Sequence, residues 1–102
     1  MIIVEGWIRF APGGLDKARA AAANLVAATR QEAGCISYTL SADLAEPDLL
    51  RIAEIWESEA AMQAHASAPH LAEFAGALRD FGVQGLNVKA YSGEFFRQLM
   101  GG

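Results

Sequence analysis

The sequence predicts an α+β fold of the β-α-β-β-α-β type, formed by a single domain over residues 1–102. Two observations predict this fold. Segments rich in β-branched and aromatic residues, which are typical of strands, alternate with segments whose apolar residues recur at helical spacing. Runs that contain glycine, proline or aspartate separate these segments and mark where each element ends. A chain of this length has room for one hydrophobic core only.

The first strand is expected over residues 2–10, because the run Ala11-Pro12-Gly13-Gly14 breaks it. Its even positions are apolar or small and its odd positions are mixed, so one face is expected to join the core while the other carries chemistry or meets solvent. The first helix is expected over residues 15–33, followed by Gly34 as its stop. Its apolar stripe consists of Leu15, Ala18, Ala22, Leu25, Val26 and Thr29.

The second and third strands are expected over residues 35–42 and 49–56, joined by a turn that contains Glu46-Pro47-Asp48. Alternate residues of a strand share a face. One face of the third strand is therefore formed by Leu50, Ile52, Glu54 and Trp56. A carboxylate and an indole on an otherwise apolar face indicate that this face meets something specific.

The second helix is expected in two pieces. Ser58 can cap a short helix that runs through His65 or Ala66, and Pro69 then marks a fresh helix start. The apolar stripe of the second piece consists of Leu71, Phe74, Ala75, Leu78 and Phe81. Gly82 and Gly85 break this helix, and the fourth strand is expected over residues 86–91.

This order of elements is the ferredoxin-like arrangement, in which an antiparallel sheet carries its helices on one face and leaves the other face bare. A bare apolar face needs a cover, and the sheet of a second copy can supply it, which predicts a homodimer in the form of a dimeric α/β-barrel. Hydrophobic residues make up 53% of the chain, which is high for so small a domain. The apolar tail at residues 93–102 is expected to dock on the partner subunit.

Composition excludes several classes of partner. The net charge is −4 and the basic residues are scattered, whereas binding to a phosphate backbone needs clustered cations, so nucleic acid is not expected. No stretch approaches the ~20 apolar residues of a membrane span, and the N-terminus lacks the basic region of a signal peptide. A cytoplasmic location is expected. The single cysteine, Cys35, suits a reducing compartment and is expected to be an inert, buried thiol.

The familiar catalytic motifs are missing from the sequence. It has no phosphate loop, no GxGxxG and no GxSxG, and flavin or nicotinamide binding has no support. His65 and His70 are five residues apart across the break before Pro69, so they do not share a helix face as an i, i+4 metal-binding pair would. A two-histidine metal site has only weak support from this spacing, and neither a metal nor a cofactor is expected.

The candidate site is a pocket of aromatic, histidine and carboxylate groups. Trp56 is either core filler at a strand end or a pocket wall that stacks on a planar ligand. Glu54 is either solvated or paired with an arginine, or it is a buried carboxylate whose raised pKa lets it take a phenolic proton. His65 is either a histidine satisfied by a backbone carbonyl or an acid/base group that faces the pocket. The predicted catalytic residues are therefore His65, Trp56 and Glu54.

Four further residues are expected to bind substrate. Trp7 lies on the mixed face of the first strand and is expected to wall the pocket together with Trp56. Met62 and Phe74 lie on the apolar stripes of the two helix pieces. His70 lies just off the second stripe, where it is either a structural residue, a rim residue or a helper of His65 in handling protons.

The ordered set of motifs resembles the antibiotic biosynthesis monooxygenase (ABM) superfamily, in particular its quinol-monooxygenase-like members. The resemblance covers almost the whole chain. It includes the Pro-Gly turn after the first strand, the alanine-rich helix and Glu32-Ala33-Gly34-Cys35-Ile36-Ser37-Tyr38. It continues through Glu54-x-Trp56-Glu57-Ser58-x-x-x-Met62-x-x-His65-x-x-x-Pro69-His70-Leu71, with Phe74 after it.

The resemblance implies a cofactor-independent monooxygenase that oxidises a quinol or polycyclic phenol with molecular oxygen. Trp56, His65 and His70 carry over best, and Glu54 carries over as part of the motif. Haem-degrading relatives need an asparagine near Trp7 and a histidine near Ala75, and this chain has neither, so haem degradation is not expected. A non-catalytic protein that binds small aromatics, a non-oxidative isomerase and a purely structural dimer module remain alternatives, because one fold hosts many functions.

Overall fold

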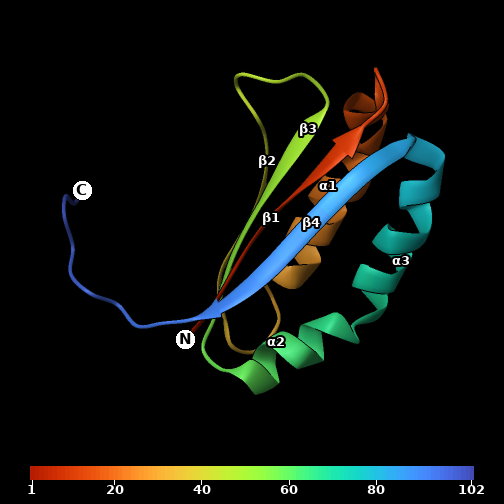
Figure 1. The fold of residues 1–102 in the computed structure, drawn as a ribbon. Helices are drawn as coiled ribbons and strands as arrows, with labels where there is room; N and C mark the ends of the chain where they lie inside the picture. Colours follow the sequence, from red (N-terminus) through yellow and green to blue (C-terminus); the bar gives the residue numbers. More distant parts are fainter.

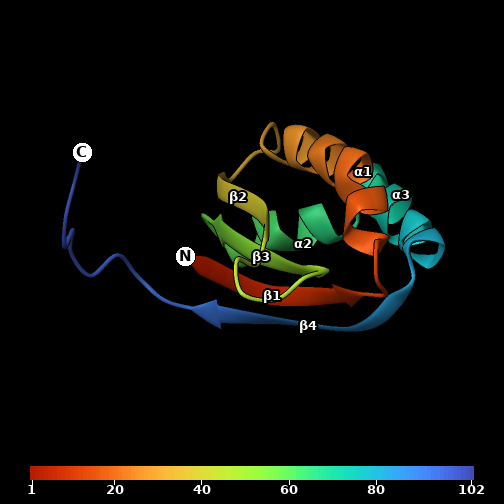
Figure 2. The ribbon, with the colours of Figure 1, turned by 90° about the horizontal axis from the view of Figure 1, so that it is seen from above.

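The computed structural model describes residues 1–102 and contains one four-stranded antiparallel sheet with the strand order β2-β3-β1-β4. The strands are β1 (Ile2–Phe10), β2 (Cys35–Ala42), β3 (Leu49–Trp56) and β4 (Val83–Ser92). The helices are α1 (Gly14–Thr29), α2 (Glu59–Ala66), α3 (Pro69–Ala77) and the 3₁₀ helix η1 (Leu78–Phe81). All helices cover one face of the sheet (Figures 1 and 2). The predicted ferredoxin-like α+β fold, with its split second helix, is confirmed.

The core lies between the sheet and the helices. In β1 the even positions Val4, Ile8 and Phe10 are buried, and in β3 the corresponding face buries Ile52 and Trp56. The register pairs Val4 with Glu54, which brings Glu54 to the helix-covered side of the sheet. The predicted division of the strands into a core face and a mixed face is therefore confirmed.

Helix α1 ends at Thr29, four residues before the predicted end at residue 33. The apolar stripe stops at Thr29, and the next backbone hydrogen bonds run to the third residue back: Glu32 N–H donates to the carbonyl of Thr29 at 3.0 Å and Cys35 N–H to that of Glu32 at 3.2 Å. Gly34 supplies the positive φ of 82° that turns the chain into β2. Glu32 therefore lies in a turn rather than on a helix face.

The second half of the chain follows the predicted pattern with shifted ends. Ser58 caps α2, its Oγ accepting the backbone N–H of Ala61 at 3.1 Å, and Pro69 occupies the first turn of α3. Strand β4 begins at Val83 rather than residue 86, because Gly82 alone makes the turn, with a φ of 74°. Gly85 lies within β4, where the indole of Trp7 covers it.

The face of the sheet opposite the helices has no cover in the monomer (Figure 2). It carries the odd positions of β1, among them Trp7, which is half-buried. The tail at residues 93–102 extends away from the domain (Figure 1), and its side chains Phe95, Phe96, Leu99 and Met100 are at least 73% exposed. None of the helices has the length and hydropathy needed to cross a bilayer.

Candidate functional site

A cavity of about 360 Å³ lies between the helix-covered face of the sheet and helices α2 and α3. Fifteen of its eighteen lining residues are hydrophobic, and the remaining three are Glu54, His65 and Lys89. A mostly apolar hollow of this volume with a few polar groups is typical of a small-molecule site. Its open side lies along β4, where Leu86 and Val88 face the helices yet remain about half exposed.

Trp56 lies behind this cavity rather than in its wall. The indole is fully buried, its Nε1–H donates to Glu54 Oε1 at 2.9 Å, and its ring stacks on the His65 ring with centroids 4.9 Å apart and planes 29° apart. The structure therefore places Trp56 as the support that holds two cavity residues in position, and not as a surface that a ligand stacks on.

The carboxylate of Glu54 is buried and accepts one hydrogen bond, from the Trp56 indole. Burial raises its pKa, and the hydrogen bond from Trp56 and the nearby His65 only partly oppose that effect. It shares a face of β3 with Ile52 and Trp56, as predicted; this face lies toward the helices, and Glu54 lines the cavity there.

The raised pKa of Glu54 should make the stability of the protein depend on pH. Because the folded state holds the Glu54 proton more tightly than the unfolded state, stability is lost as the pH rises from the ordinary carboxyl value near 4.5 through the folded pKa. Glu54→Gln, which cannot ionise, should therefore match the wild type at pH 4 and be more stable at pH 8 in urea unfolding. Glu5→Gln is the matched control, because Glu5 is exposed on the neighbouring strand. An equal difference at both pH values would contradict the prediction.

A carboxylate that the sequence analysis did not select completes the site. Glu32 Oε2 lies 2.6 Å from His65 Nδ1 and 3.0 Å from His70 Nε2. The three residues come from the turn after α1, the last turn of α2 and the first turn of α3. The side chains of His65 and Glu32 are 6% and 17% exposed, so their hydrogen bond is largely shielded from water.

The charge of Glu32 fixes the protons on both rings. Burial raises the pKa of Glu32, but the hydrogen bonds from His70 and His65 and the charges on these rings outweigh burial, so the net pKa lies below the ordinary value. An ionised carboxylate can only accept hydrogen bonds. His65 therefore donates from Nδ1 and His70 from Nε2. A neutral His65 is left with its lone pair on Nε2, the nitrogen on the other edge of a ring that lines the cavity.

Tyr38 completes the surroundings of His65. Its buried ring meets the His65 ring edge-on, with centroids 5.3 Å apart. Burial and the carboxylates of Glu54 and Glu32 raise the pKa of Tyr38 well above its ordinary value, so it stays a neutral phenol. Between Trp56 on one side and Tyr38 on another, the imidazole of His65 is held in one orientation.

The four predicted substrate-binding residues divide into two groups. Met62 and Phe74 line the cavity, so their predicted contact with a substrate stays a prediction. Trp7 does not, because odd positions of β1 point to the opposite face of the sheet, away from the helices. His70 does not line the cavity, and its side chain is 26% exposed. It is connected to His65 through Glu32, which is hydrogen-bonded to both rings.

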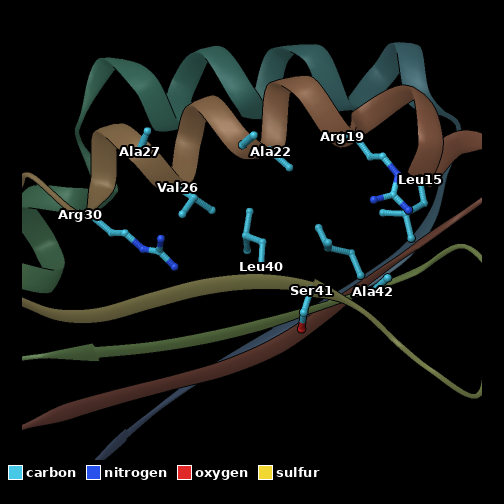
Figure 3. Close-up of a pocket in the computed structure, with 11 residues that line it drawn as sticks. Leu15, Arg19, Ala22, Val26, Ala27, Arg30, Leu40, Ser41 and Ala42 are labelled. Atoms are coloured by element: carbon cyan, nitrogen blue, oxygen red, sulfur yellow. The ribbon is translucent and has the colours of Figure 1, made fainter.

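A second hollow of about 530 Å³ lies between α1 and the edge strand β2 (Figure 3). Its sides are apolar, and two arginines reach into it: Arg19 from α1 and Arg30 from the position directly after that helix (Figure 3). Arg19 pairs with Asp16 at 2.9 Å, and Arg30 Nε donates to the carbonyl of Tyr38 at 3.0 Å. This hollow is larger but contains no histidine or carboxylate, so the cavity beside His65 is the better candidate for chemistry.

A ferredoxin-like domain with an apolar cavity and a carboxylate-held histidine in its wall places the chain among small α+β proteins with a candidate small-molecule site. Within that class, this chain belongs to the antibiotic biosynthesis monooxygenase family, whose model matches residues 1–77. The family membership predicted from the sequence motifs is confirmed.

Solved structures share the fold. A proposed antibiotic biosynthesis monooxygenase of Deinococcus radiodurans is 31% identical, covers 99% of this chain and 100% of its own, and superposes with a TM-score of 0.91. A Pseudomonas aeruginosa protein is 26% identical over 92% of this chain and 94% of its own, with a TM-score of 0.81. An uncharacterized Synechocystis protein is 29% identical over 88% of this chain; the match spans 61% of that relative's length.

Proposed function

We propose that the protein is a monooxygenase that oxidises a quinol or polycyclic phenol with molecular oxygen. Family membership supports the monooxygenase-type function, and the substrate class and the use of oxygen are our proposal. The observation that carries the proposal is the Glu32–His65 hydrogen bond of 2.6 Å at the wall of an apolar cavity. This hydrogen bond leaves Nε2 of His65 as the basic ring nitrogen that can accept a proton from a bound phenol. The ring is buried, so water is largely excluded from it.

The proposed reaction begins with proton removal. His65 Nε2 takes the phenolic proton, and the ionised Glu32 stabilises the resulting imidazolium through Nδ1–H. The electron-rich phenolate then reduces oxygen by one electron, and the two radicals combine at a ring carbon to give a peroxide anion. His65 returns its proton to the outer peroxide oxygen, which gives the hydroperoxide. This intermediate loses its outer oxygen as water together with the hydrogen of the same ring carbon, so one oxygen atom stays in the product, which for a quinol is the hydroxyquinone.

The remaining cavity residues suit this chemistry. The apolar lining holds a planar ring and keeps the radical pair together. Burial keeps the pKa of Glu54 raised, which limits the repulsion between its carboxyl group and a phenolate. The same proton-handling pair would also serve an isomerase, and the apolar lining alone would serve a binding protein, so the test must separate turnover with oxygen from both.

The test is oxygen uptake by chelator-treated protein with a panel of freshly reduced quinols and hydroxylated anthrones, corrected for autoxidation. A saturable rate is expected that His65→Ala lowers by about 100-fold or more and that Gln63→Ala retains; Gln63 is an exposed residue of the same helix. Conversion that continues without oxygen would favour an isomerase. Saturable quenching of tryptophan fluorescence without product would favour a binding protein.

We also propose that the protein is a homodimer joined through the uncovered sheet face. The half-buried Trp7 and Ile3 lie on that face, and the exposed apolar tail at residues 93–102 could dock on the second copy. Light scattering after size exclusion should give twice the chain mass of 10.9 kDa. A monomer at micromolar concentration would overturn this proposal.

A further inference from the structure

We propose that Glu32, His65 and His70 form a binding site for a divalent transition-metal ion, with Zn²⁺ as the best match, and that a bound ion blocks the base function of His65. The blocking of His65 rests on the proposed function, whereas the metal-binding site itself does not. The site arises because the fold brings the turn after α1 against the last turn of α2 and the first turn of α3.

The three side chains offer a suitable set of ligand atoms. Glu32 Oε2, His65 Nδ1 and His70 Nε2 all lie within 4.8 Å of one another. Two imidazoles and a carboxylate are ligands that Zn²⁺ prefers, with a water in the fourth position. Zn–ligand bonds of about 2.0–2.1 Å in a tetrahedron hold ligand atoms roughly 3.3 Å apart. The separations of 2.6 and 3.0 Å between Glu32 and the histidines need to open by less than ~1 Å to admit the ion. All three ligand atoms lie within 4.8 Å of one another, so the two imidazole nitrogens need to approach by at most ~1.5 Å.

The surroundings favour a cation that arrives from solvent. The carboxylate of Glu32 is the group on which both histidines converge, since its Oε2 accepts from His65 Nδ1 and from His70 Nε2. The side chains of His70 and Glu32 are 26% and 17% exposed, which leaves an approach to the ligand atoms from outside the cavity. Glu32 lies in a turn and His70 in the first helical turn after Pro69, so small adjustments of both are possible.

Metal binding reverses the tautomer of His65. In the metal-free site Nδ1 carries the proton and Nε2 the lone pair, because Nδ1 donates to an ionised carboxylate. A metal on Nδ1 takes that lone-pair position, so a neutral ring must carry its proton on Nε2. The nitrogen left for the substrate changes from acceptor to donor and can no longer take a phenolic proton. His70 changes in the opposite sense, and its proton moves to Nδ1.

The binding test is an isothermal calorimetric titration of Zn²⁺ into the chelator-treated full chain. A parallel titration with Co²⁺ gives a visible absorption spectrum of the site. We expect one ion per chain and intense visible Co²⁺ bands typical of a tetrahedral site. Glu32→Gln and His70→Ala should each weaken binding at least tenfold. Cys35→Ser is the control that excludes the nearby free thiol and should bind as the wild type does. Binding that none of these substitutions weakens would overturn the site.

The tautomer is tested separately. Nitrogen-15 NMR of the histidine rings should show His65 protonated on Nδ1 without metal and on Nε2 with Zn²⁺, whether or not a substrate is known. In the oxygen-uptake assay, Zn²⁺ should reduce the rate over the concentration range in which it binds, and His70→Ala should lose most of this sensitivity relative to its own rate. An unchanged His65 tautomer, or a rate that rises with Zn²⁺ or Fe²⁺, would overturn the blocking role while leaving the binding result intact.

Discussion

Truncating Trp56 to alanine should lower the free energy of unfolding by about 3–5 kcal/mol, the usual cost of removing a buried large aromatic side chain. The indole is fully buried in the core, so its removal leaves a void that the rigid sheet cannot close. It also takes away the Nε1–H that satisfies Glu54 Oε1 and the ring on which His65 stacks. A domain of this size is stabilised by about 5–15 kcal/mol, so the loss should remove a large fraction of the total.

Urea unfolding checks this prediction, with two matched variants. Trp56→Phe keeps most of the volume but leaves Glu54 without its donor, and should cost about 1–3 kcal/mol. Ile55→Ala, next in the chain on the opposite and half-buried face, should cost less than Trp56→Ala. An equal loss for Ile55→Ala and Trp56→Ala would mean that the indole is not a central part of the core.

The strands could be predicted from the sequence because apolar residues alternate with polar or mixed residues along them. After their first residues, half-buried Ile2 and buried Leu49, the two strands that end at Phe10 and Trp56 separate buried even positions from exposed or half-buried odd positions. Breakers bound both runs. The same alternation correctly placed Glu54 and Trp56 on one face. It could not show that the two bond to each other, because that depends on side-chain rotamers, which residue spacing does not fix.

The central carboxylate could not be predicted, because its position depends on where a helix ends. An alanine-rich run and Gly34 favoured a helix through residue 33, which would leave Glu32 on a solvated helix face. The chain instead turns after Thr29, and tertiary packing brings Glu32 to two histidines that are 33 and 38 residues further along. A signal was present in the resemblance, since Glu32 opens one of its motifs, but the motif alone does not give that residue a role.

Replacing His65 with alanine should reduce the rate of oxygen-dependent turnover by a factor of about 10²–10⁴, the usual contribution of a positioned general base. His65 is the histidine that lines the cavity, and its Nε2 is the basic nitrogen left by the hydrogen bond to Glu32. The fall should appear in kcat, since the apolar lining that binds the ring remains. Steady-state oxygen uptake with the substrate found in the panel gives kcat and KM separately.

Glu32→Gln distinguishes a base from a histidine that merely fills space. The amide keeps the size of Glu32 but removes its charge, and its NH₂ group can donate to Nδ1 and leave the proton on Nε2. Turnover should then fall by at least tenfold, with KM nearly unchanged and the fold intact by circular dichroism. If His65→Ala lowers turnover while Glu32→Gln leaves it unaltered, the carboxylate does not set the tautomer. If both variants retain full turnover, Glu32 and His65 do not remove the phenolic proton. The substrate must then lose that proton to water before it reacts with oxygen.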